Sequence, residues 1–218
     1  MAGSSPDDYE ALPFPAGTSP FRIKGTAYRG HLDYAEAQVP GGQAAIVAQI
    51  RDPALRAFLS QPFLASSWYD ILPMLPLGAA VARLVGMPLD DFLRFRTRLQ
   101  AESDMRGVYK VLLHFVTVES LALRIPRIAN TYYDFGSADA RVLAPGHVES
   151  RRTGVPEFLL PWHNPVSETY MERVIGLGGA RSPSVRVTRV ERDGSAHGVR
   201  TAAVTFAMRW TPRGGAAG

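Results

Sequence analysis

The order of patterns in the last third of the chain limits its possible folds more than any other feature. Two stretches of alternating apolar residues are followed by one short amphipathic helix that ends in glycines, and then by two more alternating stretches. These five segments cover approximately residues 140–143, 148–155, 168–177, 184–191 and 199–210. Alternation with a period of two predicts half-buried strands, so this order predicts a four-stranded antiparallel sheet with ββαββ topology.

The residues before this sheet have the apolar spacing of helices, and Gly136 marks the change of pattern. We therefore predict an α+β fold, in which a helical part at 21–136 packs on a sheet part at 137–212 within a single domain. The first 20 residues are rich in proline, glycine and serine, so we expect a disordered arm there and a frayed tail at 213–218. The junction between helices and sheet is the expected place for a pocket.

Local signals set several helix boundaries. Asp52-Pro53 combines an N-cap residue with proline at the first helical position. A later helix is predicted from Trp68 to residue 85, with a bend near Pro73 and Pro76. The clearest helix pattern lies at 88–103, and its predicted core stripe is Phe92, Phe95 and Leu99.

Three features of the sheet part are also predicted. Residues 156–165 read as an apolar, proline-rich loop that would cover any pocket. The valines at 185–190 alternate imperfectly, which indicates a β-bulge. Asp193-Gly194 is a hairpin signal, and the residues up to Gly198 lengthen that loop.

Composition and charge exclude several kinds of site and partner. The chain has no cysteine, which excludes disulfides, thiolate zinc sites and a cysteine nucleophile. Its net charge is +4, and the arginines are scattered rather than grouped with aromatic residues, so we predict no nucleic-acid binding. The N-terminus is acidic, and the most apolar stretch is interrupted by Pro73, Pro76 and Arg83. We therefore expect a cytoplasmic protein without a membrane span.

Four short motifs resemble those of a paralogous family of uncharacterised proteins abundant in myxobacteria. They are FRIKGTA at 21–27, WY at 68–69, DMRGVY at 104–109 and YYDFG at 132–136. The end of the chain, where a glycine-terminated helix precedes a strand, a hairpin and a last strand, resembles the 4-vinyl-reductase type of small-molecule-binding domain. That type belongs with the haem-NO-binding and TRAPP-like proteins. The resemblance implies ligand sensing or protein assembly rather than turnover.

The resemblance also implies an alternative, a haem-binding sensor. This sequence departs from the patterns of the two related families at two points. The cysteines usual near the last hairpin of the vinyl-reductase type are absent. The Tyr-x-Ser-x-Arg signature of the haem-NO-binding family is missing, which leaves haem without its usual propionate clamp.

Single polar residues do not assemble into a catalytic or metal site by spacing. His114, within an apolar run, is the most suggestive, since it could ligate iron or sense protonation, although a core histidine is the simpler interpretation. His31 is expected on an exposed helix face, and His163 in a loop. Asp104 is likewise expected on an exposed face. We predict no metal site and no enzyme activity, and an enzyme site around His114 with Asp104 or Arg106 is the weakest alternative.

The aromatic residues are the best candidates for a ligand site, because tyrosine and tryptophan suit positions with one apolar and one polar end. The sequence thus predicts a non-catalytic sensing or regulatory module that binds a hydrophobic small molecule, with the cofactor left unknown. A scaffolding protein that forms a homodimer, through the sheet edge or a Trp68-Tyr69 helix, is the main alternative. The predicted ligand-binding residues are Trp68, Tyr69, Leu72, Tyr109, Leu112, His114, Phe115, Tyr132 and Phe206.

Overall fold

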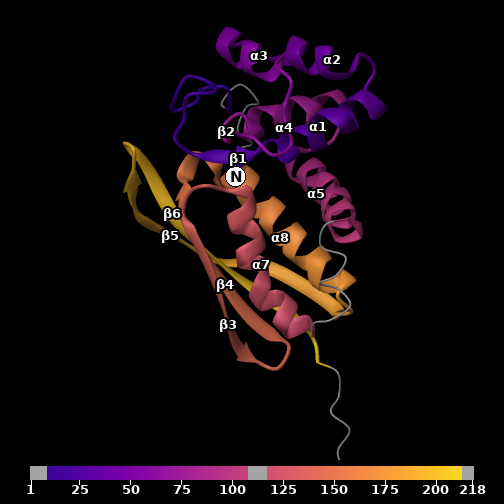
Figure 1. The fold of residues 1–218 in the computed structure, drawn as a ribbon, viewed down its shortest axis with the longest axis vertical. Coiled ribbons are helices and arrows are strands. Elements are labelled where there is room, and N and C mark those ends of the chain that lie inside the picture. The colour runs from indigo at the N-terminus through magenta and orange to yellow at the C-terminus, as the bar shows by residue number, and fades with distance from the viewer. Residues whose placement is uncertain (1–8, 108–116, 213–218) are drawn as a thin grey trace, which may run out of the picture.

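A computed structural model describes residues 9–107 and 117–212 of the chain (Figure 1). Its first half contains, in order, β1 (Arg22–Lys24), α1 (Gly25–Gln38), α2 (Gly42–Gln49), α3 (Pro53–Leu59), β2 (Trp68–Asp70), α4 (Met74–Leu84) and α5 (Leu89–Arg106). The second half contains α7 (Val118–Tyr132), β3 (Ser137–Ala144), β4 (His147–Pro156), a short 3-10 helix (Glu157–Leu159), α8 (Leu160–Leu177), β5 (Arg181–Ala196) and β6 (Val199–Thr211). The predicted α+β fold is confirmed.

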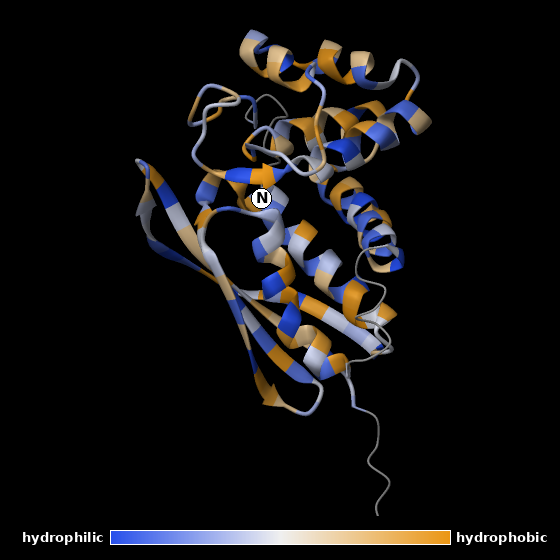
Figure 2. Ribbon diagram, in the orientation of Figure 1, coloured by the Kyte–Doolittle hydropathy of each residue, from blue (hydrophilic) through white to orange (hydrophobic). Residues whose placement is uncertain are grey.

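The four long strands form one antiparallel sheet in the order β3-β4-β6-β5, as the ββαββ pattern predicts. Helices α7 and α8 lie on one face of this sheet, where α7 packs on β3 and α8 packs on β5 (Figure 1). Hydrophilic and hydrophobic residues alternate along the first part of β3, as expected for a strand with one face toward helices (Figure 2). The two short strands β1 and β2 pair separately within the helical half.

The apolar side chains form two clusters. The first joins β1, β2 and the helices α1 to α4 with the start of α5, and includes Leu159 and Trp162. The second joins α7, α8 and the sheet with Ala101 and Met105 from the end of α5. Helices α5 and α8 therefore contribute to both clusters and connect the helical half to the sheet.

The predicted start of α3 is confirmed by its hydrogen bonds. The Asp52 carboxylate accepts the backbone N–H of Leu55 at 2.6 Å, and Pro53 occupies the first helical position. Such a cap contributes about 1 kcal/mol, because it satisfies a backbone donor that the helix itself leaves free. Thr117 caps α7 in the same way, with its hydroxyl accepting the N–H of Ser120 at 3.1 Å.

The prediction of a helix through Trp68 and Tyr69 is wrong. These residues form β2, which pairs with β1, and α4 begins only at Met74. The residue before a proline is disfavoured in the helical conformation, so Pro73 prevents α4 from extending back through Leu72. The carboxylate of Asp70 instead accepts the backbone N–H groups of Gly17, Ser19 and Leu72.

Residues 156–165 are not the predicted loop. Pro156 ends β4, and the residues after it form the 3-10 helix and the first turns of α8. Pro161 lies in the first turn, where a backbone N–H has no helical partner in any case. Pro165 lies further in, where the burial of Trp162, His163 and Pro165 itself favours the helix over a proline-rich loop.

Two further predictions need correction, and one is confirmed. Phe95 and Leu99 are 37% and 41% exposed, whereas Phe92 is buried as predicted. The β5–β6 turn lies at His197-Gly198, whose φ values of 51° and 81° suit a two-residue hairpin turn with both residues left-handed. Asp193-Gly194 falls inside β5 at a register shift, and the predicted bulge appears between Val187 and Arg189.

No helix in the two described ranges is long and apolar enough to cross a membrane.

Candidate functional site: a cavity between the helices and the sheet

A cavity lies where the helical half meets the sheet. Its walls come from β1, α1, α4, α5, α7 and α8 together with the inner faces of β3, β4 and β6. The volume of the cavity is about 130 Å³. A cavity of roughly 150 Å³ in another protein binds benzene, so this space suits a ligand with about one ring. The apolar walls include Ile23, Ile125, Ile128, Trp162, Met171 and Phe206.

Arg152 is the most unusual residue of the lining. It is only 4% exposed, because the alternation of β4 directs it, like Val148 and Ser150, toward the helices. One nitrogen, Nη2, donates to the carbonyl oxygen of Phe135 at 2.9 Å, and the guanidinium lies 4.4 Å from the ring centroid of Tyr133. The other two, Nε and Nη1, have no hydrogen-bond partner among the described residues. Burial lowers the pKa of Arg152, and no ion pair with it occurs in the described part of the chain.

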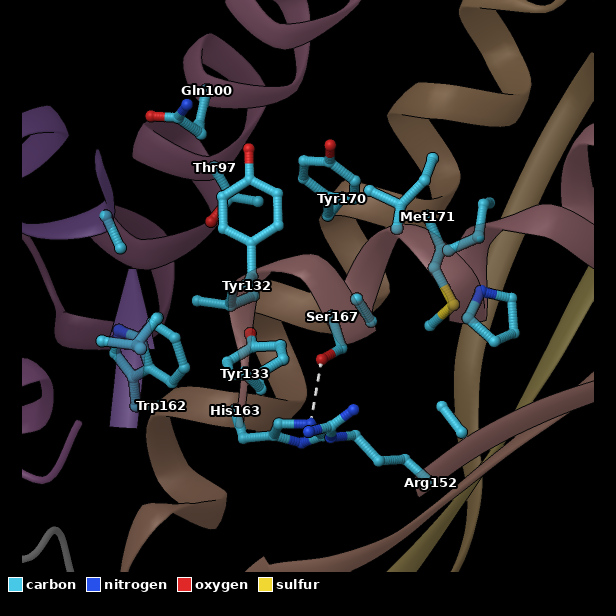
Figure 3. A pocket seen from close by; sticks show the side chains of 18 of the residues that line it. Thr97, Gln100, Tyr132, Tyr133, Arg152, Trp162, His163, Ser167, Tyr170 and Met171 are labelled. Carbon is cyan, nitrogen blue, oxygen red and sulfur yellow. Dashed lines mark hydrogen bonds between the residues drawn. The ribbon is translucent and has the colours of Figure 1, made fainter. Parts of the chain in front are cut away.

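Two histidines line the cavity and are neutral near neutral pH. His163 on α8 is fully buried, and burial together with the nearby Arg152 charge lowers its pKa to about 3. Its Nδ1 lies 3.2 Å from Asn164 Oδ1. Its Nε2 lies 3.3 Å from Ser167 Oγ, the contact drawn as a dashed line in Figure 3. Burial and the Arg96 charge lower the pKa of His31, on α1, to about 3 as well. His31 Nδ1 lies 3.2 Å from the Ala27 carbonyl oxygen, and its Nε2 has no partner in the described ranges.

A hydrogen-bonded group around Asp104 connects four helices at another side of the cavity. Asp104 Oδ2 accepts the hydroxyl groups of Tyr132 at 2.8 Å and Tyr170 at 3.0 Å, and Oδ1 accepts the Gln100 amide at 2.6 Å. Arg96 donates to Gln100 Oε1 at 3.1 Å and to the Gly30 carbonyl oxygen at 2.7 Å. The cluster thus ties α5 to α1, α7 and α8.

The lining carries one positive charge in excess. Its charged side chains are Arg96, Asp104 and Arg152, since both histidines are neutral. The negative charges of Asp104 and Asp33 act on Arg96. The unbalanced charge therefore belongs to Arg152.

The structure separates the predicted ligand-binding residues. Tyr132 and Phe206 line the cavity, as does the neighbouring Tyr133. Trp68 lies under the Lys24 ammonium group, which is 3.9 Å from the centre of its ring. Tyr69 packs against Phe63, and Leu72 is buried in the first cluster. The remaining four lie outside the described residues: Tyr109, Leu112, His114 and Phe115.

Three lining residues lie in other surroundings than the sequence predicted. His31 was expected on an exposed helix face and His163 in a loop, whereas both lie on helices and are buried. Asp104, also expected on an exposed face, lines the cavity. The one available signal for Arg152 is that it follows Val148 and Ser150 with a period of two, which places it on the inner face of its strand.

Comparison with known proteins supports the fold and no more. The sequence matches no protein-family model and no curated protein. Solved structures do match. A Tt H-NOX variant gives a TM-score of 0.62 at 10% identity, covering 88% of this chain and 98% of that one. An Fe(II) unliganded H-NOX protein from K. algicida gives 0.58 at 13% identity, with the same coverage. The fold is H-NOX-like.

One H-NOX structure was determined to study haem distortion, and it matches with a TM-score of 0.58 at 10% identity over 88% of this chain and 98% of that one. The described lining of this cavity does not fit a haem; His114, the candidate iron ligand of the sequence, lies outside the described residues. The cavity's open space is on the scale of a single ring, and His31 Nε2 is the one imidazole nitrogen of the described lining without a partner. That nitrogen lies in the field of the Arg96 cation, which opposes a bound metal cation as it opposes a proton. The Tyr-x-Ser-x-Arg signature, expected to be missing, is missing only in part: Ser150 and Arg152 keep its spacing and line the cavity, and Val148 replaces the tyrosine.

Proposed function

We propose that this protein is a non-catalytic sensing or regulatory module that binds a compact, largely apolar small molecule in the cavity. The observation that carries the proposal is a set of buried polar atoms that line an apolar cavity without a partner among the described residues. These atoms are His31 Nε2, Trp162 Nε1, Arg152 Nε and Arg152 Nη1. Buried polar atoms in folded proteins are nearly always hydrogen-bonded, so atoms left free around a cavity are available to hydrogen-bond a bound molecule.

The position of the cavity suits a sensor. Its walls belong to both halves of the chain, and α5 and α8 take part in both apolar clusters. A ligand that contacts both halves stabilises their packed arrangement over any looser one. At a concentration of 100 times its Kd, such a ligand adds about 2.7 kcal/mol to the folded state.

The serine–histidine pair of the described lining supports a non-catalytic role. Ser167 Oγ and His163 Nε2 are 3.3 Å apart, which resembles a serine–histidine pair. A general base works best when its pKa is near the operating pH, but that of His163 is lowered to about 3. The third group, Asn164, is a neutral amide and cannot stabilise an imidazolium as a carboxylate does.

A pair of alanine substitutions on one helix tests the proposal. Ala27 lines the cavity, whereas Ala37 is exposed on the same helix, so Ala27→Leu reduces the cavity and Ala37→Leu does not. Toluene, phenol and indole are titrated against each protein, with binding followed by the melting temperature and by native mass spectrometry. We expect at least one compound to raise the Tm of wild type and Ala37→Leu by several degrees, at about 2–4 °C per kcal/mol, and to have little effect on Ala27→Leu.

The proposal is contradicted if none of these compounds, nor the acids tested below, binds the wild-type protein. It is also contradicted if Ala27→Leu, shown by circular dichroism to be folded, binds them as well as Ala37→Leu does.

A further inference from the structure

We infer that the ligand is a compact organic monocarboxylic acid whose carboxylate binds Arg152, and that the cavity takes this acid in place of haem. The inference rests on the proposed function, because it names the chemical class of the molecule in the same cavity.

The first step concerns the charge of Arg152. An unpaired buried cation costs several kcal/mol in desolvation, and a partner anion with good hydrogen bonds offsets that cost. Arg152 has two free donors, Nε and Nη1, and no carboxylate of the described residues pairs with it. Its guanidinium reaches from β4 to the side of His163 within the cavity (Figure 3). An anionic oxygen from a ligand would satisfy both the charge and the donors.

The second step concerns the number of charges on the ligand. Arg96 already has Asp104 and Asp33 near it, and both histidines are neutral, so the cavity offers a single unbalanced positive charge. A carboxylate carries one negative charge and balances it. A phosphate monoester carries about 1.5 to 2 negative charges at pH 7 and would leave an excess in an apolar site.

The third step concerns size. The open space of about 130 Å³ accommodates roughly one ring with a short side group. A porphyrin or a long acyl chain would have to displace walls that include Trp162, Phe206 and Ile128, which are buried and packed on both clusters. The expected ligand is therefore an aromatic or branched acid of about this size.

The test compares acids with their neutral amides. Benzoate and phenylacetate are matched with benzamide and phenylacetamide, and each is titrated against the full chain at pH 7 by calorimetry. Each amide has nearly the shape of its acid but no charge. We expect the wild-type protein to bind the better acid about tenfold more tightly than its amide, or more, because a hydrogen bond to a charged partner is about twice as strong as a neutral one.

Two substitutions on one strand assign this preference to a residue. Arg152→Met removes the cation and keeps an apolar side chain, whereas Arg151→Met changes an exposed arginine on the outer face of β4. We expect Arg151→Met to keep the acid preference, and Arg152→Met to lose it while still binding the amide. Without ligand, Arg152→Met is expected to be at least as stable as wild type, because it removes an unpaired buried charge.

The outcomes separate the two proposals. Equal affinity for acid and amide in the wild-type protein, or an acid preference that survives Arg152→Met, overturns the monocarboxylate inference and leaves the cavity's role intact. Failure of every acid and amide to bind, together with failure of the neutral compounds above, overturns both. A haemin titration is included, and stoichiometric binding with a sharp Soret band that Arg152→Met weakens would overturn the exclusion of haem.

Discussion

His163 is buried as a neutral imidazole, and this makes folding sensitive to acid. Its pKa is about 3 in the folded chain, below the 6.5 that an exposed histidine has, because burial and the Arg152 charge both disfavour the protonated form. Below pH 6.5 the unfolded chain therefore binds a proton that the folded chain does not take up until the pH approaches 3. Stability is present above pH 6.5 and falls as the pH drops toward 3, by up to about 1.4 kcal/mol per pH unit for this group.

His163→Gln removes this titration while keeping a side chain that can hydrogen-bond Ser167. We expect the free energy of unfolding, measured with urea at pH 7, 6 and 5, to fall less steeply in the variant than in wild type. The difference should approach 1 kcal/mol per pH unit between pH 6 and 5. Parallel curves for the two proteins would show that His163 takes up a proton as readily in the folded chain as in the unfolded chain.

Individual site residues were harder to predict than the fold, for a physical reason. Tyr132 and Phe206 belong to apolar stripes whose inward direction the pattern indicates, and both line the cavity. His31 and His163 are polar residues, and nothing in their neighbours distinguishes a solvated imidazole from one desolvated by a distant helix. Their burial depends on contacts made after α1, α5 and α8 pack, as the effects of Arg96 on His31 and of Arg152 on His163 show.

At the scale of elements, α8 protects one of the two edges of the sheet. Strand β5 is an edge strand, and unpaired backbone groups at an edge invite pairing with another chain. Glu168 of α8 accepts the Val187 N–H at 2.6 Å, and Glu172 accepts the Val185 N–H at 3.2 Å. This arrangement disfavours a homodimer formed through the β5 edge.

Glu168 is the more important of the two acceptors. It is buried and also pairs with Arg94 at 2.8 Å, whereas Glu172 is more exposed and its partner Arg186 is solvated. We expect Glu168→Ala to reduce the free energy of unfolding by roughly 1–3 kcal/mol, since it leaves the Val187 N–H without its acceptor, and Glu172→Ala by less than about 1 kcal/mol. Urea unfolding measures the difference. Light scattering of the double variant tests whether the two glutamates protect the β5 edge, and we expect self-association that the wild-type protein does not show. Equal losses of stability in the two single variants would contradict the greater importance of Glu168.

Periodicity predicted most elements, and prolines account for two of the errors. Asp52 caps α3, Thr117 caps α7, and Asp90 and Asp91 lie in the first turn of α5, so local signals suffice for these helices. Around Pro161 and Pro165 the local signal favours a loop, but burial of Trp162 and His163 favours a helix. Around Trp68 the local signal favours a helix, but pairing with β1 and the restriction before Pro73 favour a strand. In each case contacts distant in sequence outweigh a weak local preference.

At the scale of the whole molecule, the question is whether the helical and sheet parts unfold together. The prediction of a single domain requires that they do, and the shared helices give the reason. Phe92 and Leu93 of α5 belong to the first apolar cluster, and Ala101 and Met105 of the same helix belong to the second. Unfolding one cluster would remove one end of α5 from its packing and leave the other end with few neighbours.

The positions of the three tryptophans allow a direct measurement. Trp68 lies in β2 of the helical half, Trp210 lies in β6 of the sheet, and Trp162 lies at the junction. Replacing Trp162 and Trp210 with phenylalanine leaves Trp68 as the only tryptophan, and replacing Trp162 and Trp68 leaves Trp210. Because both variants carry Trp162→Phe, any loosening of the junction is common to them.

We expect the fluorescence of each variant to follow the same urea midpoint as its own circular dichroism, as a two-state transition requires. The opposite outcome is that Trp210 shows the sheet still folded at urea concentrations where circular dichroism and Trp68 show that the helices have unfolded. The two parts would then be separate folding units. A ligand in the cavity between them would act by joining two domains rather than by stabilising one.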